Sequence, residues 1–184
     1  MALADYIYKK PSIITGRLTI RPLLPSDIPA LKEWMPDKNL YRYWGKKPGK
    51  TDKCPELMFE KAEKPSKSFH LGIVLNKNNK AIGELWVYLI EDDRMASVAI
   101  RISAAYQGMG YGTEALSAMA KFCFENTELK RLQAMADIRN AASCRMLEKC
   151  GFVREGLIRQ GKMVNSWCDY CIYGMLDSDY SSRK

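Results

Sequence analysis

Several features that mark membrane, secreted or metal-dependent proteins are scarce in this 184-residue sequence. No apolar run approaches the roughly 18 to 20 residues that a membrane-spanning helix needs. Residues 1–12 carry charge but lack the apolar segment of a secretion signal. The chain has one histidine, His70, which disfavours a histidine-based catalytic triad. We therefore expect a cytoplasmic protein that has no membrane partner.

The six cysteines offer little support for a metal site. One CxxC pair is present, Cys168 and Cys171, and no second pair completes the four ligands of a structural zinc site. The residues around this pair alternate between polar and apolar, which predicts a strand and sends positions i and i+3 to opposite faces. We therefore expect no metal ion, and most cysteines should be small buried hydrophobic residues.

Charge is unevenly distributed along a chain whose formal net charge is +8. Residues 38–80 hold ten lysines and one arginine against four acidic residues. This stretch is either a solvated surface or a field that attracts a phosphorylated cofactor, an acidic substrate or RNA. The aromatic and basic interleaving of RNA-recognition motifs and a KH-like GxxG placement are both missing. We therefore expect no nucleic-acid partner, except through association with the ribosome.

The hydrophobic pattern predicts an α/β fold with a mixed, mostly antiparallel central sheet of about seven strands flanked by about four helices. Polar turns at 76–80 and 91–94 join three strands into an antiparallel meander. A strand, helix, strand step across 95–137 implies a right-handed crossover and one parallel pair. The expected strands cover 17–23, 69–75, 81–90, 95–102, 131–137, 152–161 and 166–176, and the expected helices cover 26–35, 55–62, 116–124 and 140–150.

A glycine-rich segment lies between the strand 95–102 and the helix that follows it. Glycines let amide groups turn toward a ligand, and the start of a helix adds free N–H groups and a positive dipole end. The Walker A pattern is absent, and the dinucleotide pattern GxGxxG fails because Thr113 stands where its third glycine belongs. We therefore predict a pyrophosphate site at Gln107, Gly108, Met109, Gly110, Tyr111, Gly112 and Thr113.

The same loop resembles the pyrophosphate loop of the GNAT superfamily of N-acetyltransferases, Q/R-x-x-G-x-G/A, through Gln107, Gly110 and Gly112. Residues 140–152 resemble that family's N-x-x-S-x-x-x-L-E-K-x-G-F signature, and residues 17–23 and 167–173 resemble its ends. The pattern is nearest to the ribosomal-protein alanine acetyltransferases. The resemblance implies an N-acetyltransferase domain over 13–177, an N-terminal tail over 1–12 and a C-terminal tail over 178–184.

The resemblance implies that acetyl-CoA is the cosubstrate and that an amine attacks its thioester directly. The main chain of the strand end is expected to contact the pantetheine arm and the thioester carbonyl. Asn140 either contacts the cofactor arm or is only a helix cap. Ser143 either donates a proton toward the departing sulfur or is a neutral helix residue. Leu147 occupies the position of a tyrosine acid in other members, so that acid is excluded. The expected strand-end contacts are Ile100, Arg101, Ile102 and Ser103.

The general base is left open by the sequence. Ser97 occupies the position at which several family members carry a glutamate. Glu84 shares a strand face with aromatic residues, where its pKa would be raised and it would act through water, or it is an exposed strand residue. His70 and a solvent relay are alternatives. Asp169 and Tyr173 share a face of the last strand, and they either line the acceptor cleft or form ordinary cross-strand packing.

The acceptor is expected to be a primary amine, either a protein N-terminus or a small molecule. The positive field of residues 38–80 disfavours a polycation such as a polyamine or an aminoglycoside. The missing tyrosine and glutamate leave one alternative from another class, a non-catalytic CoA-binding or regulatory module. A homodimer is an assembly that the sequence leaves open.

Overall fold

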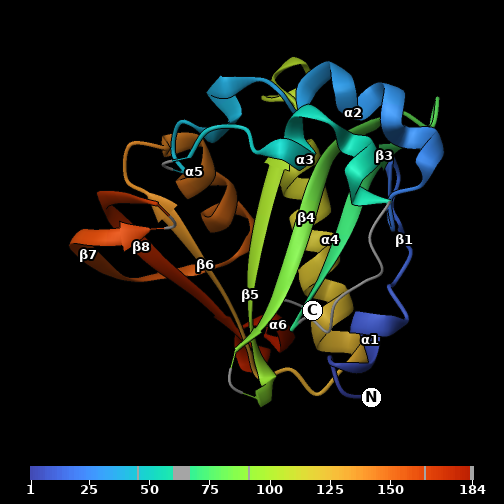
Figure 1. The fold of residues 1–184 in the computed structure, drawn as a ribbon. Coiled ribbons are helices and arrows are strands. Elements are labelled where there is room, and N and C mark those ends of the chain that lie inside the picture. Colours follow the sequence, from blue (N-terminus) through green and yellow to red (C-terminus); the bar gives the residue numbers. More distant parts are fainter. Residues whose placement is uncertain (45, 60–66, 91, 164, 183–184) are drawn as a thin grey trace.

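The computed structural model describes residues 1–44, 46–59, 67–90, 92–163 and 165–182. Their strands form one eight-stranded sheet in the order β1-β2-β3-β4-β5-β6-β8-β7 (Figure 1). The pair β5–β6 is parallel and the other neighbours are antiparallel, which confirms the mixed, mostly antiparallel sheet. The strands are β1 Ile13–Ile14, β2 Leu18–Arg21, β3 Ser68–Leu75, β4 Ala81–Ile90, β5 Asp92–Ile102, β6 Arg131–Asp137, β7 Val153–Met163 and β8 Ser166–Leu176.

Two long helices cover the ranges predicted at 116–124 and 140–150, and the other helices are short. The four-residue turn expected at 91–94 is wrong, because β5 already begins at Asp92, which pairs with Ile90; Glu91 lies outside the described residues. The helix expected over 55–62 is a 3₁₀ turn in its described part, and 60–62 lie outside. The helices are α1 Asp5–Tyr8, α2 Ile28–Trp34, α3 Lys50–Lys53, α4 Tyr111–Asn126, α5 Ala141–Cys150 and α6 Asp177–Ser181, with 3₁₀ turns η1 Pro25–Asp27, η2 Lys38–Tyr41, η3 Pro55–Met58 and η4 Ala104–Tyr106.

Helices cover both faces of the sheet. The apolar stripe of α4, which includes Leu116 and Met119, packs into the main core together with Ile73 of β3. The next residue of β3, Val74, points to the other face and packs with Leu31 of α2. This alternation follows from the period of two along a strand. The central strands are therefore buried between two layers, and Figure 1 shows α4 and α2 on opposite sides of them.

Both ends of the chain contact the core. Leu3 has no exposed surface and belongs to the main core cluster, and the ring of Tyr6 lies edge-on to Phe122 at 4.8 Å between centroids. At the other end, the ring of Tyr180 stacks on Phe124 at 5.4 Å. Residues 1–12 and 178–182 thus pack against the unit that was expected to span 13–177. The division of the chain into a domain and two tails stays a prediction.

The sheet splits between β5 and β6. Residues Met95 to Ser97 pair with Arg131 to Gln133, and beyond this point the strands pair only on their outer sides, β5 with β4 and β6 with β8. Figure 1 shows the resulting V, which opens toward α3 and α5. In the described part of the chain, the β5 edge from Val98 to Ile102 therefore has no partner strand. Unpaired main-chain groups at such an edge are available to a ligand.

Candidate active site

The three glycines of the predicted loop have different physical roles. Gly108 and Gly110 have φ angles of 77° and 81°, in the left-handed region that residues with a Cβ rarely adopt. Gly112 lies in the first turn of α4, where an added Cβ would come within 2.9 Å of Met146 Sδ in α5. Two glycines therefore shape the loop, and the third lets α4 and α5 approach each other closely.

The amide groups of this loop are free to bind an anion. Gly110 is the N-cap of the 16-residue helix α4 and provides no side-chain cap, and the first helical bond runs from Glu114 N to Gly110 O at 3.0 Å. The amides of residues 108–113 donate to no acceptor in the described part of the chain. Free N–H groups at the positive end of a long helix form a site for a diphosphate. The structure thus brings the predicted loop residues together at the start of α4, and their binding of an anion stays a prediction.

Gln107 holds the loop in place. Its Nε2 donates to the carbonyl of Ile102 at 2.8 Å, which ties the loop to the last residue of β5. Of the other loop side chains, that of Met109 is exposed and that of Tyr111 lies 4.5 Å below the guanidinium of Arg17. The glutamine of the motif is therefore a loop anchor in this structure.

Two residues that sequence reasoning missed, Arg17 and Glu114, brace the loop. Arg17 Nη1 donates to Met109 O at 3.1 Å, and Arg17 Nε donates to Glu114 Oε2 at 2.6 Å. Glu114 Oε1 accepts a hydrogen bond of 2.6 Å from the hydroxyl of Thr15. The turn between β1 and β2 is thus fixed to the start of α4. No local pattern reveals this contact, because Arg17 and Glu114 are 97 positions apart.

The end of β5 directs side chains to both faces of the sheet. Ile100 and Ile102 pack against the main core on the α4 face. Arg101 points to the opposite face and is only 7% exposed. The main chain of these residues lies along the open edge at the split, as the predicted contact to a pantetheine arm requires. The side chain of Arg101 enters a separate cluster, which the prediction did not include.

The start of α5 holds Asn140 and Ser143. Asn140 Oδ1 accepts a hydrogen bond of 3.2 Å from Ser143 N, so Asn140 caps α5, and its contact with the cofactor arm stays a prediction. Ser143 is half-buried, and its hydroxyl has no hydrogen-bond partner in the described part of the chain. Ser143 lies one turn before Met146, on the α5 face that meets Gly112. Its role as an acid stays a prediction, and Leu147 is buried, as its position in the core requires.

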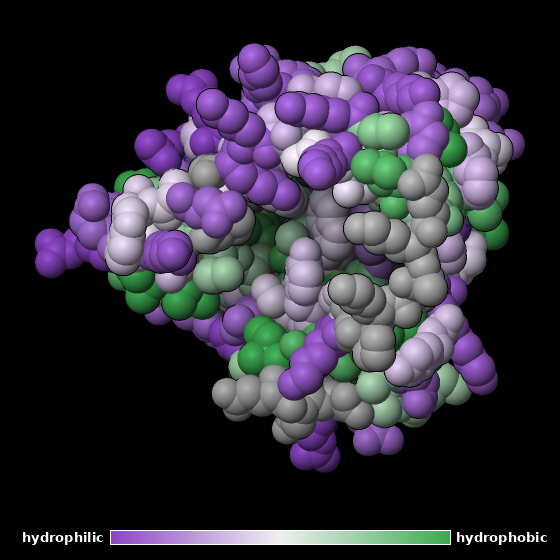
Figure 2. Space-filling view, viewed as in Figure 1, coloured by the Kyte–Doolittle hydropathy of each residue, from purple (hydrophilic) through white to green (hydrophobic). Residues whose placement is uncertain are grey.

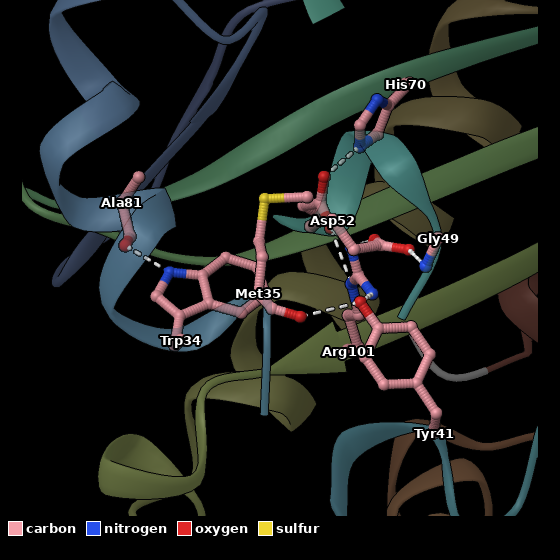
Figure 3. A network of polar contacts seen from close by, with 9 residues as sticks. Trp34, Met35, Tyr41, Gly49, Asp52, His70, Ala81 and Arg101 are labelled. Atoms are coloured by element: carbon pink, nitrogen blue, oxygen red, sulfur yellow. Dashed lines mark hydrogen bonds and ion pairs between the residues drawn. The ribbon is translucent and has the colours of Figure 1, made fainter. Parts of the chain in front are cut away.

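Glu84 is a buried partner in an ion-pair network with Arg101 and His70, both of which are labelled in Figure 3. It has no exposed surface, its Oε2 accepts from Arg101 Nε at 2.6 Å, and its Oε1 lies 2.9 Å from His70 Nε2. Burial alone would raise the pKa of Glu84, but the neighbouring His70 ring and the guanidinium of Arg101 outweigh burial and hold that pKa below its usual value. The expected raised pKa is therefore wrong. Whether Glu84 serves as a base stays a prediction.

The two residues expected at the acceptor cleft lie apart. Tyr173 is buried in the main core, and its hydroxyl donates to Glu148 of α5 at 3.2 Å, so it packs α5 against the sheet. Asp169 Oδ1 accepts from Gln160 N at 2.8 Å and supports the β7–β8 hairpin. Asp169 also borders a hollow of about 230 Å³ beside Arg139 and Trp167.

The described residues contain no cluster of three or more side chains suited to hold a metal ion. Cys171 belongs to the main core cluster, whereas Cys168, three residues earlier in the same strand, does not. No helix in the described ranges has both the length and the apolar character needed to cross a membrane.

A split mixed sheet, followed at the end of β5 by a loop of free amides that opens a long helix, is an arrangement suited to a phosphorylated ligand. Residues 17–153 match the family model described as "Acetyltransferase (GNAT) domain". The chain belongs to this family. A curated relative, "Probable N-acetyltransferase YjcK" of Bacillus subtilis (strain 168), is 30% identical over 123 residues, which are 65% of this chain and 67% of the relative.

Solved structures with the same fold differ in the acceptors that they name. Spermidine N-acetyltransferase from Vibrio cholerae, in complex with CoA and spermine, has a TM-score of 0.76 and 21% identity over 91% of this chain and 99% of that chain. Ribosomal-protein-S5-alanine acetyltransferase from Vibrio fischeri has a TM-score of 0.76 and 22% identity over 93% of this chain and 99% of that chain. These similarities establish the fold, and they leave the acceptor to be argued from the site.

Proposed function

We propose that this protein transfers the acetyl group of acetyl-CoA to a primary amine. The observation that carries the proposal is the set of free amides at residues 108–113, placed after the end of β5, on the open side of the split sheet. Membership of the acetyltransferase family supports acetyl-CoA as the cosubstrate. The Vibrio cholerae relative that was solved with CoA provides further support.

The site fits each part of this cosubstrate. The loop amides match a diphosphate, and Gly108 and Gly110 leave room that a Cβ and its strain would remove. The edge of β5 from Val98 to Ile102 lacks a partner strand and, apart from the Ile102 carbonyl that Gln107 engages, matches the amide groups of a pantetheine arm. Bound acetyl-CoA supplies an activated acetyl thioester. The chain's own task is to hold it still, so that an incoming amine meets the carbonyl in a fixed geometry.

We assign the proton donor to Ser143. Its hydroxyl is not engaged by another described residue, and it lies on the α5 face that meets the start of α4. From this position it can donate a hydrogen bond toward a departing thiolate and stabilise the charge that develops there. The buried Leu147, one turn further along α5, has no proton to give. Ser143 is thus the group on α5 best placed for this role.

We assign the acceptance of the amine proton to solvent. The geometry gives Glu84 little freedom to act as a base, because it is fully buried and already engaged by Arg101 and His70. An N-terminal amine has a pKa of about 7.7 to 8.0, so a sizeable fraction is neutral near pH 7 without help. Loss of the remaining proton to water after attack needs no dedicated residue.

The acceptor proposed here is a protein N-terminus or a small primary amine. The excess of lysines over residues 38–80 argues against polycations, whereas the Vibrio cholerae relative named for spermidine shows that the fold permits them. The ribosomal-protein alanine acetyltransferase type, a cytoplasmic location and a homodimer stay predictions.

Thiol release from acetyl-CoA, measured with a panel of amines, tests this function. The panel contains peptides with free N-termini, amino acids, spermine and an aminoglycoside. We expect the highest kcat/KM for a peptide or a small primary amine. A highest kcat/KM for spermine or the aminoglycoside would contradict the acceptor assignment. Acetyl-CoA binding by calorimetry without transfer to any amine would instead favour a non-catalytic CoA-binding module.

A further inference from the structure

A buried arginine connects three parts of the chain on the sheet face opposite α4. Arg101 Nε donates to Glu84 of β4 at 2.6 Å, and Arg101 Nη2 donates to Asp52 of α3 at 2.9 Å. Its Nη1 donates to the hydroxyl of Tyr41 in η2 (Figure 3). The Tyr41 hydroxyl in turn donates to Met35 O at 2.8 Å. One side chain thus holds residues from η2 and α3 against the two central strands.

Aromatic rings enclose the same guanidinium. The carbon Cζ of Arg101 lies between 5.1 and 5.9 Å from the ring centres of four aromatic residues. Removing one partner from a buried ion pair is strongly destabilising, so such a cluster favours a single arrangement of the chain around it. The cluster therefore fixes residues 38–44 and 46–53, which we call the η2–α3 segment, over the end of β5. The four rings belong to Trp34, Tyr41, Trp44 and Trp86.

The η2–α3 segment lies across the open end of the split. In Figure 1 it runs from α2 toward α5 and returns to α3 above β5, and Figure 2 shows a hollow below it. On the far side of the split, the pKa of Arg139 is raised mainly by its hydrogen bond and ion pair with Asp137. The proposed cofactor loop lies at the start of α4. The part of the opening under the η2–α3 segment is therefore available to the acceptor.

The exposed surface of the segment is cationic. Its one acidic residue, Asp52, already accepts from Arg101 and from Gly49 N, and the pKa of Asp52 is held below its usual value. No carboxylate in the described ranges pairs with the segment's exposed cations. Hydrophilic side chains cover this region in Figure 2. The exposed cations are Lys38, Arg42, Lys47, Lys50 and Lys53.

We propose that the η2–α3 segment selects acceptors that carry acidic groups close to the reacting amine, and that the natural acceptor class is an acidic peptide N-terminus. This inference rests on the acetyl transfer proposed above. Uncompensated cations beside a cleft raise the local concentration of anionic partners and repel polycations. The ion-pair cluster gives this field a fixed position over the site.

Two peptides with the same first residue test the proposal, one continuing with aspartate and glutamate and the other with asparagine and glutamine. We expect kcat/KM to be about tenfold higher for the acidic peptide at low salt, and the difference to shrink in 0.5 M salt because exposed charges are screened. The KM for acetyl-CoA should be the same with both peptides. Equal kcat/KM values at low salt would overturn the proposal.

A matched pair of double variants tests whether the preference for the acidic peptide comes from the η2–α3 segment. Lys47→Glu with Lys50→Glu reverses two charges of the segment, whereas Lys9→Glu with Lys121→Glu reverses two exposed lysines elsewhere. The first variant should lose most of the preference for the acidic peptide, roughly tenfold, and the second should keep it. Loss of the preference in both variants, or in neither, would contradict a role for the segment.

Fluorescence anisotropy of the labelled peptides, in the presence of CoA, separates this proposal from the proposed reaction. The protein could transfer acetyl groups to no amine and still bind the acidic peptide more tightly than the neutral one. That result would contradict the proposed acetyl transfer and support the proposed preference for acidic peptides. Tight, salt-sensitive binding of an oligoribonucleotide without any preference for the acidic peptide would overturn the acidic-peptide assignment.

Discussion

Gly110 shows how a single residue shapes the cofactor site. Its φ of 81° lies in the left-handed region, and an added Cβ would lie 3.4 Å from Arg17 Nη2. An alanine in this conformation costs about 1 to 2 kcal/mol. We expect Gly110→Ala to weaken CoA binding by roughly tenfold in a calorimetric titration. Gly156→Ala is the control, because its Cβ would meet no atom within 4 Å; equal affinity in both variants would contradict the assigned loop geometry.

Ser143 can be tested without disturbing the helix that carries it. Its main-chain N–H, rather than its hydroxyl, forms the cap with Asn140, so Ser143→Ala keeps the start of α5. We expect kcat to fall about 100-fold and the KM for acetyl-CoA to stay within twofold, because the hydroxyl acts only as charge develops on sulfur. Ser117→Ala in α4 is the matched control and should retain activity. A normal kcat for Ser143→Ala would remove Ser143 from the mechanism.

Glu84 links protonation to stability. Because its pKa is lower in the folded protein, ionised Glu84 stabilises the fold above its unfolded-state pKa of about 4.3. That contribution is lost as the pH falls through the folded-state value. Glu84→Gln leaves Arg101 with one carboxylate fewer, and we expect it to lower the free energy of unfolding by about 3 kcal/mol at pH 7.

Urea unfolding of wild type and Glu84→Gln from pH 7 to pH 3 tests this linkage. The difference in unfolding free energy should narrow as the pH falls below about 4.3. Wild type then loses the stabilisation contributed by ionised Glu84, which the variant lacks at every pH. Glu33→Gln, whose side chain is 59% exposed in its pair with Lys80, should stay within about 0.5 kcal/mol of wild type throughout. A difference that widens in acid would show that the folded-state pKa of Glu84 is not lowered.

At the scale of elements, the η2–α3 segment depends on Asp52 for its position. Asp52→Asn keeps the shape of the side chain but removes the charge that faces Arg101. We expect the KM of the acceptor to rise roughly tenfold, while the KM of acetyl-CoA changes by less than twofold, because the segment lies away from the loop at the start of α4. Steady-state kinetics with each substrate varied in turn provides the measurement.

The control for Asp52→Asn is a similar substitution in an exposed ion pair. Asp177→Asn breaks an exposed pair with Lys130 and should leave both KM values unchanged. If Asp52→Asn raised both KM values equally, the cluster would support the whole molecule and would have no particular link to the acceptor.

The long elements were predictable because their signals are local. The apolar spacing of α4 and the alternation of β8 can be read within a single window of sequence. The two-residue strand β1 and the four-residue helices α1 and α3 are too short to show a period, and tertiary contacts such as the burial of Leu3 stabilise them instead. The split of the sheet also follows from pairing that no single segment reveals.

At the scale of the whole molecule, the candidate site also combines features that local sequence signals predict with contacts between residues far apart in the chain. The loop 107–113 and the cap at Asn140 were predicted, because glycine and cap residues act on their own neighbourhood. The brace from Arg17 to Glu114 spans 97 positions, and the bond from Arg101 to Asp52 spans 49. Such contacts exist only in the folded chain. For this reason the raised pKa expected for Glu84 was wrong, since the pairing of β3, β4 and β5 brings His70 and Arg101 beside it.

The molecule places its two proposed binding functions on either side of one opening. We propose the loop at the start of α4 as the cofactor site and the η2–α3 segment, on the open side of the split between β5 and β6, as the acceptor site. Arg101 is linked to both proposed sites, since its main chain lies on the edge of β5 and its side chain holds the segment. We therefore propose that β5 aligns the two substrates.

Backbone amide NMR during a titration with CoA tests the central claim most directly. If the amides of residues 108–113 bind the diphosphate, their resonances should show the largest shifts in the protein and saturate with the same dissociation constant. Amides of the distant β7–β8 hairpin should stay nearly unchanged. Saturable CoA binding that leaves the 108–113 amides unmoved, or no binding at all, would contradict the account.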